Sequence, residues 1–256
     1  MGWISKDFLT EGGLKVLILG SYGTGKSYFA KTFPEPIFLL DFDRGAISYG
    51  DRKVFVPDYF TSEQNPSTLL SMVEADLDKL LIQSHPEGQF KTIVLDSLTT
   101  LSKVAMDLAL QKRPVSPDSP PVWNVHYPMV KVYLDRILDK LRRFSGFCVV
   151  IGHVEYQRDD LSGEVLALPA LIGKLQSYVP AIFDEVYFAD VVSTKNGLQY
   201  TIHLSPKGFK RARSRLRSVF PQIPESIPND WKHISSWLSK GKPMSDDPTK
   251  TGKGGR

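Results

Sequence analysis

A short glycine-rich run near the start of the sequence has the composition of a phosphate-binding loop. Residues 20–27 read Gly-Ser-Tyr-Gly-Thr-Gly-Lys-Ser, which matches the pattern G-x-x-x-x-G-K-[ST]. The glycines let backbone N–H groups approach phosphate oxygens, and Lys26 supplies a mobile positive charge for the β- and γ-phosphates. We therefore expect nucleotide phosphates to be bound by Gly20, Ser21, Tyr22, Gly23, Thr24, Gly25, Lys26, Ser27 and Tyr28.

An aspartate at the end of a later apolar run is the expected magnesium partner of this loop. Residues 92–97 read Thr-Ile-Val-Leu-Asp-Ser, so Asp96 follows the pattern of a buried strand. The carboxyl ends of parallel strands meet at one edge of a sheet, where Asp96 would face the same crevice as the loop. The hydroxyl of Ser27 and the carboxylate of Asp96 are hard oxygen ligands that suit Mg²⁺.

Two further polar residues follow apolar runs and are candidates for hydrolytic chemistry. Asp43 comes just after the second run, within reach of a γ-phosphate, where it would orient or deprotonate water. Asp41 is the second candidate for that role, and a solvated loop carboxylate is the alternative interpretation of Asp43. His153 ends the fourth run, beside the loop, and is a candidate γ-phosphate sensor or a purely structural histidine. Together with Lys26, Asp43 and His153 are the predicted catalytic residues.

Strand and helix patterns alternate along most of the chain. The strand patterns are short apolar runs typical of a buried parallel sheet, at residues 15–20, 36–42, 92–96 and 147–152. Helical periodicity is clear at residues 67–83, 98–111 and 129–144. This alternation predicts an α/β fold with a mostly parallel central sheet flanked by helices.

Three segments depart from this alternation. Residues 113–128 contain five prolines and predict a loop, and the polar stretch within 154–171 predicts a projecting hairpin or flexible loop. Strand-like runs at 184–194 and 198–205 are joined by Lys-Asn-Gly, which predicts a C-terminal β-hairpin extension.

Composition sets further bounds. The 256 residues suit one large α/β domain, which we expect over 14–238, after an N-terminal segment (1–13) and before a disordered basic tail (239–256). A short helix is expected at 231–238. The single cysteine, Cys148, excludes an internal disulfide and a multi-cysteine zinc site. No stretch has the pattern of a signal peptide or a membrane span, so we expect a cytoplasmic protein without a membrane partner.

A dense basic block follows the predicted hairpin. Residues 207–217 contain six basic residues in eleven, and no acidic residue occurs from 191 to 224. Such a run attracts a polyanion, and contact with a DNA backbone would be salt-dependent and independent of sequence. A solvated charged face is the alternative interpretation. The candidate residues are Lys207, Lys210, Arg211, Arg213 and Arg215.

The order of these motifs resembles the RecA-like ATPases. In that fold, another strand separates the phosphate-loop strand from the aspartate strand. More closely, residues 92–101, 168–175 and 183–186 are similar to the compact phage ATPases of the Sak single-strand-annealing group, and the likeness covers roughly residues 14–215. The resemblance implies Mg²⁺-dependent ATP hydrolysis coupled to single-stranded DNA in recombination or annealing. It also implies a homo-oligomeric ring or filament, located in the bacterial host cytoplasm if the gene is phage-encoded.

The resemblance assigns roles to single residues as well. By position, Asp43 is the catalytic carboxylate, where the family usually has glutamate, and the shorter side chain favours slow hydrolysis or a binding switch. Lys210, Arg211 or Arg213 would act as a finger in a neighbouring subunit's ATP site. The segments 113–128 and 154–171 would approach DNA, with Trp123, His126 and Tyr127 stacking on bases or packing the first loop onto the body. The resemblance would also allow a single-strand-binding protein as a partner.

Two other functions fit the phosphate loop. One is a nucleotide-controlled replication accessory, such as a helicase loader or a helicase-like ATPase, with tight ATP binding and little turnover. The other is a small-molecule kinase, which would need an arginine-bearing lid, and the segment 154–171 offers only Arg158 among four acidic residues. A GTPase is disfavoured because the sequence has no Asn-Lys-x-Asp motif for guanine.

Overall fold

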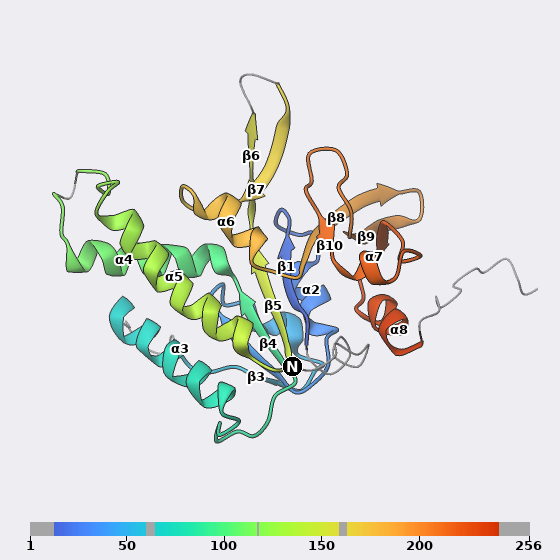
Figure 1. The fold of residues 1–256 in the computed structure, drawn as a ribbon, viewed down its shortest axis with the longest axis horizontal. Helices are drawn as coiled ribbons and strands as arrows, with labels where there is room; N and C mark the ends of the chain where they lie inside the picture. Colours follow the sequence, from blue (N-terminus) through green and yellow to red (C-terminus); the bar gives the residue numbers. More distant parts are fainter. Residues whose placement is uncertain (1–12, 60–64, 117, 159–162, 241–256) are drawn as a thin grey trace, which may run out of the picture.

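The computed structural model describes residues 13–59, 65–116, 118–158 and 163–240, and its centre is a twisted nine-stranded sheet (Figure 1). The strand order is β11-β9-β8-β1-β5-β4-β2-β3, with β10 paired to β8. Five neighbouring strands from the first two-thirds of the chain are parallel: β1 (Lys15–Leu19), β5 (Phe147–Gly152), β4 (Thr92–Asp96), β2 (Ile37–Asp41) and β3 (Val54–Phe55). Strand β5 therefore lies between β1 and β4, as the resemblance predicts.

The central strands are apolar throughout because both faces of the sheet are covered. Along β1, Leu17 and Leu19 face one core, and Val16 and Ile18 face the other. The first core is closed by α3 (Pro66–Leu81), α4 (Leu98–Lys112), α5 (His126–Arg143) and α6 (Leu175–Ala181). The second core is closed by α2 (Lys26–Lys31), the 3₁₀ helix η1 (Ala46–Tyr49), α7 (Leu216–Val219) and α8 (Lys232–Lys240).

The C-terminal part of the chain extends the sheet beyond the phosphate-loop strand. The first half of β8 (Glu185–Thr194) pairs in parallel with β1, and its second half forms an antiparallel hairpin with β9 (Gly197–His203). The predicted hairpin is thus present, with Lys195 and Asn196 as the turn and Gly197 already in the strand. Two short strands complete this end, β10 (Arg213–Ser214) and β11 (Ser226–Pro228).

A second hairpin stands away from the sheet, at the top of Figure 1. It consists of β6 (Val154–Arg158) and β7 (Val165–Pro169), in the segment where a projecting hairpin or loop is predicted. It continues directly from β5 past His153, so its base lies at the carboxyl edge of the parallel strands. That edge also bears the phosphate loop.

Two predicted boundaries that differ from the structure are the start of α5 and the end of α8. Helix α5 begins at His126, inside the predicted loop 113–128, because Pro128 lies in the first helical turn, where no intrahelical N–H bond is needed. Helix α8 extends to Lys240, so the predicted tail is helical at its first two residues. The rest of that tail and almost all of the N-terminal segment lie outside the described residues. Among the described helices, none is long and apolar enough to span a membrane.

Candidate nucleotide-binding site

The phosphate loop connects β1 to α2 at the carboxyl edge of the sheet, and glycine is required at two of its turns. Gly23 has φ 72° and Gly25, which precedes α2, has φ 82°, both in the left-handed region. A Cβ at Gly25 would lie 2.3 Å from the amide nitrogen of Asn229, so this position also has no room for a side chain. The loop therefore presents backbone and the amino end of α2 to the pocket.

The cation of the loop is held in place by the loop itself. Lys26 is 6% exposed, and its Nζ donates to the carbonyl oxygen of Ser21 at 2.6 Å. Thr24 Oγ1 donates to the same carbonyl at 2.8 Å. Burial lowers the pKa of Lys26, although Asp96 and Asp43 oppose this effect. A phosphate oxygen would be a stronger, charge-assisted partner for this ammonium than the neutral carbonyl.

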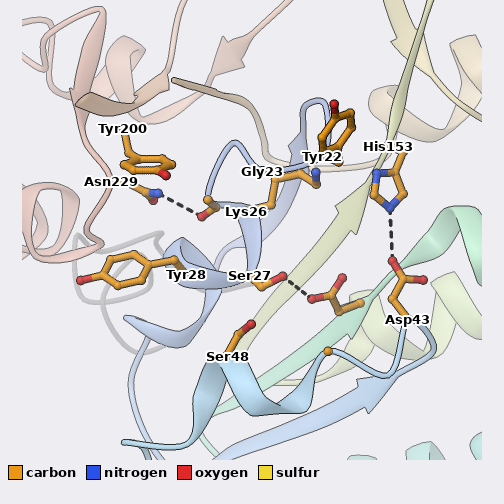
Figure 2. Close-up of a pocket in the computed structure, with 13 residues that line it drawn as sticks. Tyr22, Gly23, Lys26, Ser27, Tyr28, Asp43, Ser48, His153, Tyr200 and Asn229 are labelled. Atoms are coloured by element: carbon orange, nitrogen blue, oxygen red, sulfur yellow. Dashed lines mark hydrogen bonds and ion pairs between the residues drawn. The ribbon is translucent and has the colours of Figure 1, made fainter. Parts of the chain in front are cut away.

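The predicted magnesium ligands lie in direct contact. Ser27 Oγ donates to Asp96 Oδ2 at 2.7 Å, from α2 to the end of β4 (Figure 2). Asp96 is 4% exposed, and its burial raises its pKa to about 6 against the opposing effect of the Ser27 hydrogen bond. The nearby carboxylates Asp43 and Asp41 raise it further. The negative charge of ionised Asp96 is thus buried, and the positive charge of Lys26 balances it only in part.

Asp43 and His153 form a second contact in the site, beside the Ser27–Asp96 pair. His153 Nε2 lies 3.2 Å from Asp43 Oδ2, while Ser97 Oγ donates to Asp43 Oδ1 at 2.9 Å and Thr100 Oγ1 donates to the same oxygen. Burial alone would raise the pKa of Asp43, but the three side-chain hydrogen bonds outweigh it and lower the pKa to about 2. Asp43 is therefore a well-oriented, fully ionised carboxylate and a weak base.

Asp41, the second candidate for the hydrolytic role, has a different environment. Its Oδ1 accepts from the backbone N–H of Gly45 at 2.9 Å, and its Oδ2 accepts from that of Ala46 at 2.8 Å. Both oxygens thus hold the start of η1, and the side chain is buried. This geometry gives Asp41 a structural task and leaves Asp43, which lines the pocket, as the candidate for the hydrolytic role.

One pocket of about 790 Å³, within the ~300–1,000 Å³ range of ligand sites, is lined by Lys26, Ser27, Asp43, Asp96 and His153. Asp43 and His153 lie toward one end of it (Figure 2). Tyr200 of β9 and Asn229, which follows β11, lie at the opposite end, with the phosphate loop between the two ends (Figure 2). The C-terminal extension therefore contributes directly to this site.

The projecting hairpin contacts the phosphate loop. Tyr156 Oη of β6 lies 3.1 Å from Ser21 Oγ, within hydrogen-bond distance. The Tyr156 ring packs edge-to-face on Phe209 of the basic block, with ring centroids 5.4 Å apart, and the N–H of Ala167 in β7 donates to the carbonyl of Phe209. The phosphate loop thus contacts the hairpin, and the hairpin contacts the basic block.

Most cations of the basic block are engaged within the chain. Lys210 pairs with Asp190, Arg211 with Glu164 at 2.9 Å, and Arg215 with Asp184 at 2.9 Å. Arg213 donates to the backbone carbonyls of Pro180 and Phe183, at 3.0 and 2.7 Å. Lys207 is exposed and begins the turn that ends at Lys210. The block therefore also holds the C-terminal segment onto the body.

We expect Arg213→Ala to lower the free energy of unfolding by about 1–3 kcal/mol, because two backbone carbonyls lose a charged donor. Denaturant titration measures the change. Arg211→Ala is the matched control, since an exposed ion pair contributes only about 0–1 kcal/mol. Equal stability of the two variants would show that Arg213 has no anchoring role.

The aromatic residues of the first predicted DNA loop do not share one environment. His126 is 1% exposed, and its ring nitrogens lie within hydrogen-bond distance of the backbone at Val122 and Arg113, so it does not present a face for stacking. Trp123 packs against Tyr127, with ring centroids 4.3 Å apart, yet is 62% exposed. His126 therefore packs the loop onto the body of the protein, whereas Trp123 packs on Tyr127 and still has an exposed ring.

The site contains residues that the sequence reasoning did not identify. Ser97 follows Asp96 directly and Thr100 lies three residues further on, in the first turn of α4; a serine at a helix N-cap is the available signal. Tyr156, Tyr200 and Asn229 carry no local motif, because only the sheet topology brings them to the loop.

A family model matches the part of the chain that contains most of this site. A model of the AAA domain family matches residues 12–216. No curated protein matches the chain. Among solved structures, a KaiC-like protein from the archaeon Pyrococcus horikoshii OT3 is 12% identical, with 80% of this chain and 84% of that chain covered and a TM-score of 0.44. An ATPase of the type III secretion system of pathogenic bacteria is 16% identical, with 70% and 52% covered and a TM-score of 0.40, so this chain spans about half of its length.

The family match covers well over half of the chain and includes the phosphate loop, Asp96 and His153. The strand order, with β5 between β1 and β4, is that of the RecA-like architecture. The chain belongs to the AAA domain family and is a P-loop ATPase of RecA-like fold.

Proposed function

We propose that this protein hydrolyses Mg²⁺-ATP and couples hydrolysis to single-stranded DNA, in recombination or annealing of the kind carried out by the phage Sak group. The observation that carries the proposal is the chain of contacts from the phosphate loop through Tyr156 to Phe209 and the basic block. It joins a nucleotide pocket to a basic, aromatic surface within one subunit.

The residues present fit a magnesium ion. Ser27 and Asp96 supply a hydroxyl and a carboxylate oxygen that already lie within 2.7 Å of each other. The raised pKa of Asp96 reports a buried negative charge that a cation would stabilise. When bound, Mg²⁺ would neutralise charge on the β- and γ-phosphates. We assign its binding to these two residues.

The hydrolytic step is assigned to the cluster around Asp43. Ser97, Thr100 and His153 fix both oxygens of this carboxylate, which suits it to orient a water molecule. His153 reaches Asp43 from the end of β5, beside the phosphate loop, so a terminal phosphate would meet both side chains. This arrangement supports His153 as the γ-phosphate sensor.

The hairpin surface is the proposed DNA contact. We define it as the exposed residues Tyr156, Arg158, Lys207 and Phe209, which combine rings with positive charge. Stacking on rings and contact with the backbone are the two means by which proteins hold single strands, at about 1–3 kcal/mol per stacked base. Lys207 is also the residue of the block best placed to reach DNA or a neighbouring subunit in a ring or filament.

Purified protein tests this function directly. We expect ATP turnover to require Mg²⁺ and to rise several-fold with single-stranded DNA at low salt, with the stimulation falling as salt increases. A coupled ATPase assay with and without a mixed-sequence oligonucleotide measures both effects. Turnover that is indifferent to DNA at low salt would contradict the DNA role and leave the ATPase assignment intact.

Tyr156→Phe should uncouple DNA from hydrolysis, because it removes only the hydroxyl that contacts Ser21. We expect basal turnover and DNA affinity to stay near the wild-type values and the stimulation by DNA to fall several-fold. Tyr178→Phe, at another exposed tyrosine, is the matched control. Full stimulation in Tyr156→Phe would mean that the hydroxyl contact carries no signal.

A nucleotide-controlled accessory, such as a helicase loader, is the second candidate function, and the low pKa of Asp43 favours it. A carboxylate with a pKa of about 2 is a weak base, so turnover would be slow unless its donors move. Tight ATP binding with negligible turnover, in the presence and absence of DNA, would select this function over the first.

A further inference from the structure

The far end of the nucleotide pocket is formed by two residues that no phosphate-loop motif includes. Tyr200 lies on β9 and Asn229 follows β11, and both line the same pocket as Lys26 and Ser27. We propose that Tyr200 and Asn229 form the subsite for the nucleotide's base, and that this subsite takes a purine with an amino group at position 6. This inference rests on the proposed nucleotide-binding function and names the base that the site selects.

The distribution of charge orients the nucleotide in the pocket. The end with Asp43 and Asp96 holds the carboxylates and the Ser27 hydroxyl, so it suits the terminal phosphate and its cation. The end with Tyr200 and Asn229 presents a ring and a neutral amide (Figure 2). A nucleoside triphosphate bound along the loop would therefore direct its base toward Tyr200.

The ring of Tyr200 is held at a defined position relative to the phosphates. A Cβ built on Gly25 would lie 3.1 Å from Tyr200 Cδ1, so the ring packs directly against the loop. Tyr200 is 38% exposed, which leaves part of its ring open to a ligand. A partly exposed ring beside a phosphate site is a platform for a planar base.

The amide of Asn229 adds a polar contact. The carbonyl of Gly25 only accepts hydrogen bonds, so the amide nitrogen must face it, and the two atoms are 3.0 Å apart. Asn229 Oδ1 is then an acceptor, and it is buried without a hydrogen-bond partner among the described residues. An unsatisfied buried acceptor is unfavourable, and a donor from the ligand would offset that cost. The 6-amino group of adenine is such a donor, whereas the 6-carbonyl of hypoxanthine is an acceptor.

Equilibrium binding with three probes tests the subsite: ATP, inosine triphosphate, and inorganic tripolyphosphate, which has no base. We expect Tyr200→Ala to weaken ATP binding roughly 5- to 150-fold, the factor that corresponds to about 1–3 kcal/mol of stacking, and to leave tripolyphosphate binding unchanged. Tyr200→Phe should retain ATP binding because it keeps the ring. Leu198→Ala, at an exposed residue two positions earlier on β9, is the matched control.

The wild-type protein should bind ATP about 10-fold more tightly than inosine triphosphate, and Asn229→Ala should remove this preference. Equal affinity of the wild type for both nucleotides would overturn the assignment to Asn229. Unchanged ATP binding in Tyr200→Ala, or an equal loss of ATP and tripolyphosphate, would overturn the base subsite. If Asn229→Ala also lost tripolyphosphate through collapse of the loop, Tyr200→Ala would decide. A wild type that binds neither ATP nor tripolyphosphate would contradict the proposed function instead.

Discussion

Lys26→Ala is expected to weaken ATP binding by roughly 100-fold or more and to abolish measurable turnover. A charged hydrogen bond is worth about 1.5–3 kcal/mol, and this ammonium would contact more than one phosphate oxygen. The change should spare the fold, because among the described residues the Lys26 ammonium makes a single hydrogen bond, to the Ser21 carbonyl, which Thr24 also contacts. Isothermal titration with a slowly hydrolysed ATP analogue measures the affinity.

The control for this variant is Lys103→Ala, which removes the same charge from an exposed position on α4. It should bind ATP as the wild type does. Wild-type affinity in Lys26→Ala would exclude the loop as the phosphate site, whatever the rest of the pocket binds.

Asp43→Asn is expected to lower ATP turnover by about 100- to 10,000-fold while ATP affinity stays within a few-fold of the wild type. The substitution keeps the shape and an acceptor for Ser97 and Thr100, but it removes the charge that orients water. Single-turnover hydrolysis and nucleotide titration separate the two quantities. Asp51→Asn, at an exposed carboxylate paired with Lys31, should leave both unchanged.

The pH dependence follows from the same geometry. Hydrogen bonds hold the pKa of Asp43 at about 2, below its ordinary value, so the carboxylate is charged above that pH and protonates only as the pH falls through it. A fall in turnover between pH 8 and pH 5 would therefore not come from Asp43. Undiminished hydrolysis by Asp43→Asn would remove this residue from the mechanism.

The parallel core could be predicted because its signals are local. Each apolar run lies on a strand buried on both faces, and each polar residue after a run lies at the shared carboxyl edge. The contact between Ser27 and Asp96 follows from these two facts alone. Strand β8 is harder to predict, because its buried first half and exposed second half form one continuous strand-like run that is typical of one arm of a hairpin.

The remaining contacts depend on partners that are distant in the sequence. The density of the basic block predicts an attraction to polyanions, but it carries no information about Asp184, Asp190 and Glu164, which pair with its cations from other segments. Asn229 likewise reaches Gly25 across 204 positions of sequence. Long-range pairs of this kind have no periodicity or motif and become visible only in the folded chain.

The contact between Gly25 and Asn229 also sets an order of events during synthesis. Asn229 donates to the carbonyl of Gly25, before the start of α2. At the other end of this helix, Trp231 N donates to Thr32 Oγ1, and the Trp231 ring stacks on Phe33 with ring centroids 4.2 Å apart. Both ends of α2 therefore depend on residues that are synthesised much later. At about 5–20 residues per second, the ribosome needs roughly 10–40 s to extend the chain from one partner to the other. During that interval the nascent chain carries the complete phosphate-loop motif without its C-terminal support. We expect nucleotide to be captured in its final geometry only after this last segment has emerged.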